Sequence, residues 1–403
     1  RALCRGMNTR FEAGIDPNEP VAISKAGEYD ADLIEALLRR QLTSLGISDM
    51  FEGRSVVIKP NLVMKKAPGS AAVTHPVLLE AMIRILSDSA SEIVIAESPP
   101  GLYTPQALRG FYTVCGIDKV AEKYGVRLNY DTSKKSVSLP DARASHMFDL
   151  ISPILDADVV VNLAKLKSHA LTKYSGAVKN YFGCVPGVQK VECHARFPDY
   201  NVFASMLDDL AAYIATSKPT FNVVDGILAM EGNGPTGGDP VPLGLVISGR
   251  NPFNVDCAAA KLIGWDNIPM LDEAERRGYC RPDPIELRDG VDENFRAESF
   301  RLPDSIEPGK KHSSSIVMLS RLCGGRIYKW ISPRPEIDNK ICVGCGECAR
   351  ACPKHTIELV ADGKKRKARV NIDGCIRCYC CQELCMYKAV KIKKNPIFTL
   401  LGG

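Results

Sequence analysis

Long apolar runs are missing from this chain of 403 residues, and so is any tract of low complexity. A helix that crosses a bilayer needs about 20 predominantly apolar residues, and no stretch of the sequence approaches that length. The first twenty residues, RALCRGMNTRFEAGIDPNEP, also lack the apolar segment of a secretory leader. We therefore expect a protein with no membrane span and a cytoplasmic location.

Aromatic residues are scarce, at 7% of the chain with 2 tryptophans, and the net charge is a modest +5. The one strongly basic run, KKRKAR at 364–369, has no interleaved aromatic residues on which nucleic-acid bases could stack. We therefore expect no nucleic-acid partner. The run is interpreted either as a solvated hairpin tip or as a docking patch for an acidic redox partner.

Cysteine, in contrast, is abundant: the chain has 16, and nine of them lie between Cys342 and Cys385. Secreted disulfide frameworks belong mostly to small domains and spread their cysteines through the fold. Here the cysteines cluster with gaps of two, two and three residues. This pattern favours metal ligation in a reducing compartment.

Two segments follow the spacing C-x2-C-x2-C-x3-C. The first holds Cys342, Cys345, Cys348 and Cys352, and the second holds Cys375, Cys378, Cys381 and Cys385. A zinc ribbon would need two CxxC pairs rather than two quartets. The C-terminal ~60 residues resemble the bacterial two-cluster ferredoxins, which bind [4Fe–4S] clusters through such runs. Between the quartets, the Asp362-Gly363 pair predicts a hairpin of two strands.

The ferredoxin resemblance implies that the fourth cysteine of each run reaches the other cluster. One [4Fe–4S] cluster would then be held by Cys342, Cys345, Cys348 and Cys385, and the second by Cys375, Cys378, Cys381 and Cys352. Met386 stands where a proline usually follows, and Cys380 is expected to be a spare thiol. Such clusters pass single electrons at low potential, so we expect a redox partner protein such as a ferredoxin or flavoprotein, and an anaerobic host.

The preceding residues alternate Val/Ile-rich runs with helical patterns. Strands are expected at 55–60, 92–98, 126–131, 158–164, 221–226, 243–249 and 314–320, and helices at 30–46, 75–89, 104–112, 199–215 and 254–264. Continuous apolar runs indicate strands that are buried on both faces. The sequence predicts an α/β domain over 1–320, a mostly parallel sheet with helices on both faces in one or two lobes. A linker over 321–335 and a small α+β ferredoxin-like domain over 336–395 would follow.

Polar side chains stand where the predicted strands end. They are Lys59, Asn61, Glu97, Asn162, Lys165, Lys167, Asp225 and Glu231. Ligands of open parallel sheets gather beyond the carboxyl ends of the strands, so we expect a cofactor or substrate site at this edge. The segment EGNGPTGG at 231–238 is no dinucleotide motif, because Pro235 interrupts it and a strand follows. It is interpreted as a glycine-rich turn, either structural or close to an anionic group.

The stretch from Asn162 to His194 carries five lysines, two of the six histidines and two cysteines. We expect it to be too polar for the core, with Lys173 and Lys190 solvated. Cys184 is interpreted as a small buried hydrophobe. The alternative is that Cys184 and Cys193 bind a metal together with His194.

The first ~320 residues resemble the family called domain of unknown function 362, often fused to a two-cluster ferredoxin. The resemblance lies in IKPNL, AESPPG, NLAKLKSHALTKYSGAVKNYFGCVPG, VVDGILAMEGNGPTGGDP and NPFNVDCAAAKLIG. A fainter similarity is to the lactate racemase family, in the order of His169, SGAVK at 175–179, Pro186-Gly187 and His194. That similarity implies a cofactor or substrate contact at Lys179, a ligand at His194 and an acid or base at His169. Ala177 and Glu97 depart from that family's pattern.

The resulting hypothesis is a redox enzyme that receives electrons through two [4Fe–4S] clusters. A small anionic substrate, or a further cofactor such as a flavin or nickel, would be held at the strand ends. His169, Lys179 and Glu97 are the candidate catalytic residues. The candidate binding residues are Lys59, Asn61, Lys165, Lys167, Asn180, Asp225, Glu231 and His194. Two alternatives stay open: an electron-transfer subunit with no catalytic site, and a racemase-like enzyme with structural or regulatory clusters.

Overall fold

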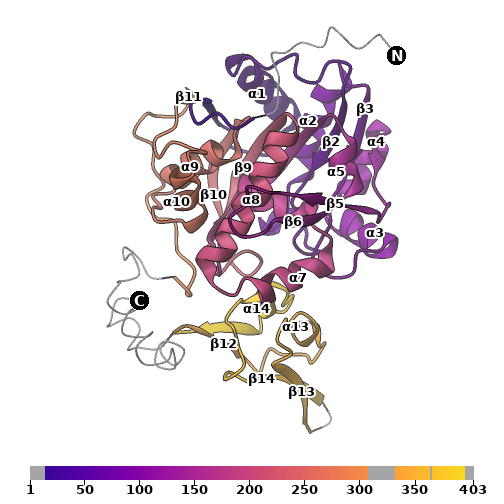
Figure 1. The fold of residues 1–403 in the computed structure, drawn as a ribbon, viewed down its shortest axis with the longest axis vertical. Helices are drawn as coiled ribbons and strands as arrows, with labels where there is room; N and C mark the ends of the chain where they lie inside the picture. The colour runs from indigo at the N-terminus through magenta and orange to yellow at the C-terminus, as the bar shows by residue number, and fades with distance from the viewer. Residues whose placement is uncertain (1–13, 307–331, 364, 395–403) are drawn as a thin grey trace.

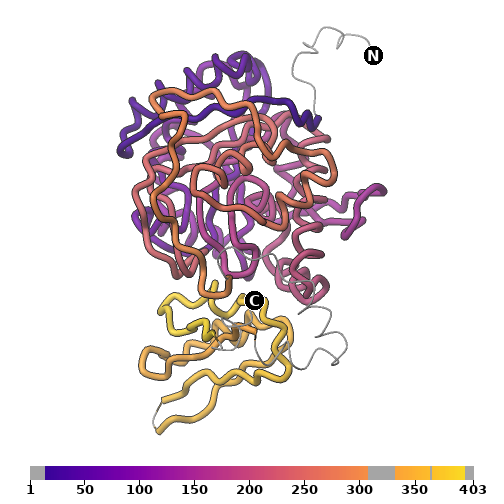
Figure 2. Tube along the Cα trace, turned by 90° about the vertical axis from the view of Figure 1, so that its left-hand side faces the viewer, coloured from indigo at the N-terminus to yellow at the C-terminus, as the bar shows by residue number. Residues whose placement is uncertain are grey.

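The computed structural model describes residues 14–306, 332–363 and 365–394. The chain forms a large part that ends at residue 306 and a small part that begins at residue 332, and the two lie one above the other (Figures 1 and 2). The expected strand at 314–320 and most of the expected linker at 321–335 fall outside the described residues. No helix of the described residues is long and apolar enough to cross a membrane.

One sheet of nine strands organises the large part. Its order is β11-β1-β10-β9-β7-β2-β3-β4, with β8 paired to β7. The strands are β1 (Val21–Lys25), β2 (Ser55–Lys59), β3 (Glu92–Ile95), β4 (Arg127–Leu128), β7 (Val159–His169), β8 (Lys173–Ser175), β9 (Thr220–Glu231), β10 (Asp239–Gly249) and β11 (Glu286–Asp289). The central strands β9, β7, β2, β3 and β4 are parallel, whereas β10 runs antiparallel to β9 and β1. The predicted α/β class with a mostly parallel sheet is confirmed.

Helices cover both faces of this sheet (Figure 1). The first face packs against α1 (Ala31–Ser44), α2 (Pro76–Ser87), α3 (Pro105–Val114) and α4 (Ile117–Tyr124), and the second packs against α5 (Ser152–Asp156), α6 (Ala177–Asn180), α8 (Tyr200–Ser217), α9 (Pro252–Leu262) and α10 (Pro269–Arg276). Successive residues of β7 alternate between these two cores, because neighbouring side chains of a strand point to opposite faces. Val159 and Val161 join the first core, and Val160 and Ala164 join the second.

The helix starts follow the expected capping chemistry. The Asp30 carboxylate accepts hydrogen bonds from the backbone N–H groups of Asp32 and Leu33 at the start of α1. The Thr104 hydroxyl likewise accepts from Ala107 N–H, with Pro105 as the first residue of α3. These local signals were readable in the sequence, and they place the predicted helices within a few residues of their observed bounds.

The prediction that the stretch Asn162–His194 is too polar for the core is wrong. All of β7 is buried, and so are β8 and most of α6. Lys173 and Lys190, expected to be solvated, are each only 7% exposed. The stretch continues through the short helix η3 (Tyr181–Cys184) into α7 (Gly187–Arg196). Its polar groups are tolerated inside because they hydrogen-bond to one another and to backbone carbonyls.

The small part contains two antiparallel strand pairs and two short helices. These are β12 (Arg334–Ile337) with β15 (Val390–Lys393), β13 (Ile357–Asp362) with β14 (Lys365–Val370), α13 (Glu347–Arg350) and α14 (Cys380–Glu383). The β13–β14 pair confirms the predicted hairpin. A separate hairpin, β5 (Lys134–Ser138) with β6 (Met147–Ile151), belongs to the large part, as does the single turn η2 (Pro68–Ser70).

The glycine-rich turn between β9 and β10 is where the small part docks. Gln382 Nε2 donates to the carbonyl of Asn233 at 2.8 Å, and the Thr236 hydroxyl donates to the carbonyl of Glu383 at 2.6 Å. Tyr379 and Ile392 pack with Ala170 in a small apolar cluster that spans the two parts. Helix α14 is therefore held against the carboxyl edge of the sheet.

Candidate functional site

A small cavity of about 50 Å³ lies where α14 meets the carboxyl ends of β2, β3 and β7. Residues from both parts of the chain line it. The polar members of its lining are Lys59, Asn61, Glu97, Ser98, Lys167, His169, Ser175, Lys179, Asn180, Lys190 and Glu383. One water needs about 10–15 Å³ measured in this way, so the cavity has room for roughly four non-hydrogen atoms. We refer to it as the interdomain pocket.

A hydrogen-bonded network forms the floor of this pocket. Lys59 Nζ lies 2.5 Å from Glu97 Oε2 and 3.1 Å from Asn180 Oδ1. Asn61 Nδ2 donates to the same Asn180 oxygen at 2.8 Å, and Asn61 Oδ1 accepts from Lys167 Nζ at 2.7 Å. Four predicted binding residues and the predicted catalytic Glu97 are thus brought together by β2, β3, β7 and α6.

Glycine at position 183 is required for this network. A Cβ atom there would lie 2.2 Å from Glu97 Oε1 and 2.3 Å from Lys59 Nζ. Helix α6, which carries Lys179 and Asn180, is fixed by the buried Asp256 carboxylate. That carboxylate accepts from the N–H groups of Ala177 and Val178 at 2.7 and 2.9 Å. The segment is held rigidly, which positions Lys179 over the pocket.

Two buried polar atoms of the pocket lining, Nε2 of His169 and the Ser98 hydroxyl oxygen, have no hydrogen-bond partner among the described residues. The partly exposed Lys179 has its Nζ 5.8 Å from the centre of the Phe182 ring, with no carboxylate within ion-pair distance in the described residues. His169 Nδ1 accepts from Leu171 N–H at 3.1 Å and Thr172 N–H at 3.3 Å. The proton of the neutral ring therefore sits on Nε2, which faces Glu383 Oε2 at 3.7 Å.

Burial lowers the pKa of the basic side chains around the pocket. It brings the pKa of Lys167 down to about 7, with the charges of Lys179 and other lysines acting in the same direction. Burial likewise lowers the pKa of Lys190 to about 8. The pKa of His169 falls well below its usual range, first through burial and then through Lys179 and Lys167. His169 is therefore neutral near pH 7, whereas Lys167 titrates there.

Several predicted site residues lie elsewhere. Lys165 and Asp225 form their own buried ion pair at 2.8 Å, and the Tyr29 hydroxyl lies 2.6 Å from Lys165 Nζ. Glu231 pairs with Arg301 at 2.6 Å beside the glycine-rich turn. None of these three predicted binding residues lines the interdomain pocket.

His194 lies on α7, buried and stacked on Phe203 with ring centroids 4.5 Å apart. It does not line the pocket, although its Nδ1 has no partner among the described residues. Burial, followed by the charge of Lys179, lowers its pKa to about 3. Neither this residue with Cys184 and Cys193 nor any other group of three His, Cys, Asp or Glu in the described ranges has the arrangement of ligands around a single metal ion.

Sequence reasoning missed four polar residues of the pocket lining, namely Ser98, Ser175, Lys190 and Glu383. Glu383 is the one that comes from the small part. It belongs to α14 and stands two positions after Cys381, so its sequence neighbourhood pointed only to the clusters. The ammonium group of Lys190 donates to the carbonyls of Ser98 and Val185. No sequence signal marks either residue, because both reach the pocket only through tertiary packing.

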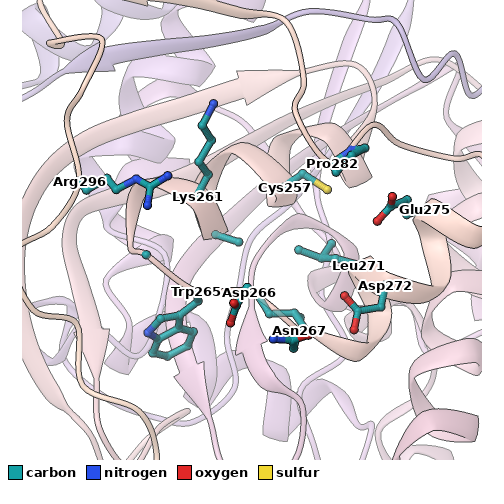
Figure 3. A pocket seen from close by; sticks show the side chains of 13 residues that line it. Cys257, Lys261, Trp265, Asp266, Asn267, Leu271, Asp272, Glu275, Pro282 and Arg296 are labelled. Carbon is teal, nitrogen blue, oxygen red and sulfur yellow. The ribbon is translucent and has the colours of Figure 1, made fainter. Parts of the chain in front are cut away.

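A larger cavity of about 570 Å³ lies at the far side of α9 and α10 (Figure 3). It contains none of the predicted site residues. Its carboxylates, on Asp266, Asp272 and Glu275, are exposed, and so is Arg296. Water screens these exposed charges, so they attract a ligand more weakly than the buried charges of the interdomain pocket do. We therefore place the candidate site in the smaller cavity.

The cysteines of the small part gather close enough for their thiols to act on one another, and the crossed assignment of ligands stays a prediction. Burial raises the pKa of Cys348 to about 11, and the nearby thiols of Cys345, Cys385 and Cys342 raise it further. Burial also raises the pKa of Cys375, and the thiols of Cys378 and Cys352 add to the effect. Each quartet thus has the fourth cysteine of the other run beside it.

The backbone around these cysteines fits [4Fe–4S] clusters. N–H groups point at ligand sulfurs: Ala389 to Cys385 at 3.2 Å and Thr356 to Cys352 at 3.3 Å are two examples. Such hydrogen bonds to sulfur help to set a cluster's potential. Gly344 and Gly346 have positive φ angles of 71° and 83°, as the tight binding loop requires.

Fold and site together define an α/β protein joined to a ferredoxin-type iron–sulfur domain, and the comparisons with known proteins agree. Residues 56–261 match the domain of unknown function DUF362, and residues 341–389 match a 4Fe–4S dicluster domain. The first match covers half of the chain, so this chain belongs to the DUF362 family. Its ferredoxin-type domain supports iron–sulfur electron transfer in general.

Two curated proteins are similar in sequence. A thylakoid-associated protein from Synechocystis sp. is 31% identical over 306 residues, which cover 72% of this chain and 89% of that protein. A ferredoxin from Pyrobaculum islandicum is 37% identical over 57 residues, 14% of this chain and 50% of the ferredoxin. The first similarity covers most of the relative, whereas the second concerns the small part of the chain alone.

Two solved structures share a distant likeness. The lactate racemase apoprotein from Thermoanaerobacterium thermosaccharolyticum is 16% identical with a TM-score of 0.38, and a Thermotoga maritima protein is 9% identical with a TM-score of 0.37. The matches cover 65% and 62% of this chain, which spans 59% and 60% of those chains.

Proposed function

We propose that this chain is an iron–sulfur redox protein that delivers single electrons to a small anion, or to an anionic cofactor, in the interdomain pocket. The observation that carries the proposal is the position of Glu383. This residue follows the predicted cluster ligand Cys381 by two positions, and its carboxylate lies 3.7 Å from His169 inside the pocket. The predicted ligand helix and the candidate site therefore touch.

The residues proposed to hold the clusters are the two crossed quartets, Cys342, Cys345, Cys348 and Cys385, and Cys375, Cys378, Cys381 and Cys352. When bound, [4Fe–4S] clusters supply low-potential single electrons. We also propose the division of the chain into an α/β domain over 1–320 and a ferredoxin-like domain over 336–395. The contacts of Thr236 and Gln382 support a fixed placement of the second domain over the first.

The charges of the pocket support an anionic ligand. Four lysines, namely Lys59, Lys167, Lys179 and Lys190, face two carboxylates, Glu97 and Glu383. Lys59 is already paired with Glu97, whereas Lys179 has no acceptor among the described residues. The Lys179 ammonium is partly exposed, and a carboxylate or phosphate group bound in the pocket would stabilise it through a charge-assisted hydrogen bond.

The neutral His169 ring would donate a hydrogen bond from Nε2 to this anion. Because Nδ1 accepts from two backbone N–H groups, a proton on Nδ1 would face two donors, so the ring resists protonation. His169 is thus suited to stabilise negative charge as a substrate is reduced. Lys167, with its pKa near 7, is better suited to supply a proton.

The alternatives receive less support. A docking-only large domain would have no need of a buried cavity with an unpaired ammonium group and an unpaired imidazole nitrogen. A racemase-like reaction needs a second proton carrier opposite His169. Glu97, the candidate for that role, lies 2.5 Å from Lys59, so its Oε2 is already engaged in a buried ion pair.

The variant Lys179→Ala tests the proposal. Acetate serves as the probe anion, and its binding to anaerobically prepared holoprotein is measured by isothermal titration calorimetry. Loss of one charge-assisted hydrogen bond should weaken binding by about tenfold or more. Iron content and the EPR spectrum should not change. Lys173→Ala is the matched control, because Lys173 is a lysine of the same stretch that is only 7% exposed and lies outside the pocket.

Equal acetate affinity in the wild-type protein and Lys179→Ala, or no acetate binding at all, would contradict the proposal that the pocket binds an anion. The chain would then be an electron carrier without a substrate site. Mass spectrometry of small molecules released from the same preparation would identify a further cofactor. A flavin found there would be far too large for a cavity of about 50 Å³, so it would show that the large part binds its ligand elsewhere.

A further inference from the structure

The surface around Cys345 differs from the rest of the small part. Of the cysteines in the described residues, Cys345 alone is exposed. Four large apolar residues next to the ligands of the same quartet are also exposed: Ile341 at 38%, Val343 at 54%, Met386 at 55% and Tyr387 at 51%. Apolar side chains of this size at the surface mark interaction sites more often than single scattered ones do. We refer to Cys345 and these four residues as the Cys345 surface.

Basic side chains border the Cys345 surface. Strand β14, which carries the basic run, lies directly against the Cys342–Cys345 loop, since a Cβ at Gly344 would be 2.2 Å from the Arg366 carbonyl. Lys367 Nζ donates to the Cys342 carbonyl at 2.5 Å. Arg350, Arg366 and Lys340 are exposed nearby, and so is Lys388, whose Nζ also donates to the Gly238 carbonyl of the large part at 3.4 Å. Of the acidic neighbours, Glu347 is paired with Arg350, and Asp338 accepts from the backbone N–H of Lys340.

The second quartet has the opposite surroundings. Tyr379, Cys380 and Gln382, which stand between or beside its ligands, are each under 9% exposed and lie against the large part. Figure 1 shows α14 next to the large part, with β13 and β14 farther from it. The second quartet thus lies toward the interdomain pocket, whereas Cys345 of the first quartet is exposed to solvent.

We infer that the Cys345 surface is the docking site of an electron-donor protein whose own surface is acidic around an apolar centre. From Ser332 to Lys394 the sequence has 14 lysines and arginines against 7 aspartates and glutamates, so the charge complements such a partner. One electron leaves the reduced donor, which becomes oxidised, and this chain is reduced by one electron. No bond forms and no proton moves. The inference rests on the proposed relay, but it concerns only the entry of electrons.

The test uses a reduced, acidic two-cluster bacterial ferredoxin as the donor and the full-length holoprotein as acceptor, without oxygen. Carbodiimide cross-linking joins lysines to carboxylates, and mass spectrometry then maps the joined residues. We expect cross-links at Lys340, Lys367 and Lys388. In stopped-flow experiments, Val343→Glu should lower the second-order rate constant for reduction by roughly tenfold, because it places a negative charge at the centre of the contact.

Met147→Glu is the matched control, since Met147 is 62% exposed on β6, in the large part. Both variants should be reduced at the wild-type rate by photoreduced 5-deazariboflavin, which is too small to need a docking surface. If Val343→Glu loses iron, Met386→Glu replaces it. Cross-links confined to the large part, equal slowing in Met147→Glu, or a ferredoxin rate that does not fall with added NaCl would each overturn the inference. Acetate binding plays no part in these measurements. They would therefore remain valid even if the pocket proved not to bind an anion.

Discussion

Lys167 shows how strongly burial and neighbouring charges can lower the pKa of a single side chain. It is 1% exposed, and two of its ammonium hydrogens are used by Asn61 Oδ1 and the Ala72 carbonyl. Burial and the neighbouring lysines lower its pKa to about 7. Below that pH the side chain is charged and attracts an anion, and above it the side chain is neutral. The charge of the pocket therefore depends on pH in the physiological range.

Acetate binding should consequently weaken as the pH rises through about 7. Acetate keeps its own charge from about pH 6 to about pH 8.5, so the change would come from the protein. The measurement is isothermal titration calorimetry from about pH 6 to about pH 7.5, below the pKa of about 8 of Lys190, which also lines the pocket. Lys167→Arg, which stays charged throughout, should remove most of the pH dependence, whereas Lys135→Arg on the exposed β5 should not. Identical slopes for the wild-type protein and Lys167→Arg would assign the pH dependence to another group.

At the scale of elements, the short helices α13 and α14 carry the cysteines that decide the cluster assignment. Cys348→Ser should lower the iron content by up to one cluster, because Cys348 is predicted to be a ligand of the first quartet. Cys380→Ser is the control, since Cys380 is a neighbouring cysteine of the same region predicted to be a spare. Iron analysis and EPR of anaerobic preparations measure both. Full iron retention in Cys348→Ser, or loss of iron in Cys380→Ser, would show that the register of the ligands is different.

The elements that the sequence predicts best are those with local signals. Helices α1, α2 and α3 begin at capping residues, and β2 is a continuous apolar run, so each was found within a few residues of its bounds. Strand β7 was predicted to end at Ala164 but continues to His169. Its lysines, Lys165 and Lys167, were expected beyond the strand end as binding residues, and only tertiary partners such as Asp225 and Asn61 make their burial tolerable.

The candidate site follows the same pattern. The rule that ligands gather at the carboxyl ends of parallel strands led to Lys59, Asn61, Glu97 and Lys167, which do meet there. It also led to Lys165 and Asp225, which form an ion pair with each other outside the pocket. Glu383 could not be found this way, because its place depends on how the small part packs on the large one.

At the scale of the whole molecule, Glu383 links the two parts of the chain. Its carboxylate faces His169 in a pocket whose charge is otherwise positive, so it competes with an incoming anion. Glu383→Gln should therefore tighten acetate binding by severalfold, about 0.5–1 kcal/mol if the charge is partly screened. Glu347→Gln, on the corresponding helix α13 but exposed, should leave the affinity unchanged. Weaker binding in Glu383→Gln would mean that the carboxylate helps to hold the ligand.

The hydrogen bonds of Thr236 and Gln382 to the opposite part have a consequence for how the rate depends on conditions. A free ferredoxin must meet its enzyme by diffusion in every cycle, so dilution slows it. Here the second cysteine quartet is tethered next to its target, and the local concentration is set by geometry alone. The rate of electron transfer from this quartet to the pocket should therefore not depend on protein concentration. Only the transfer of electrons from the external donor to the chain should depend on the donor concentration.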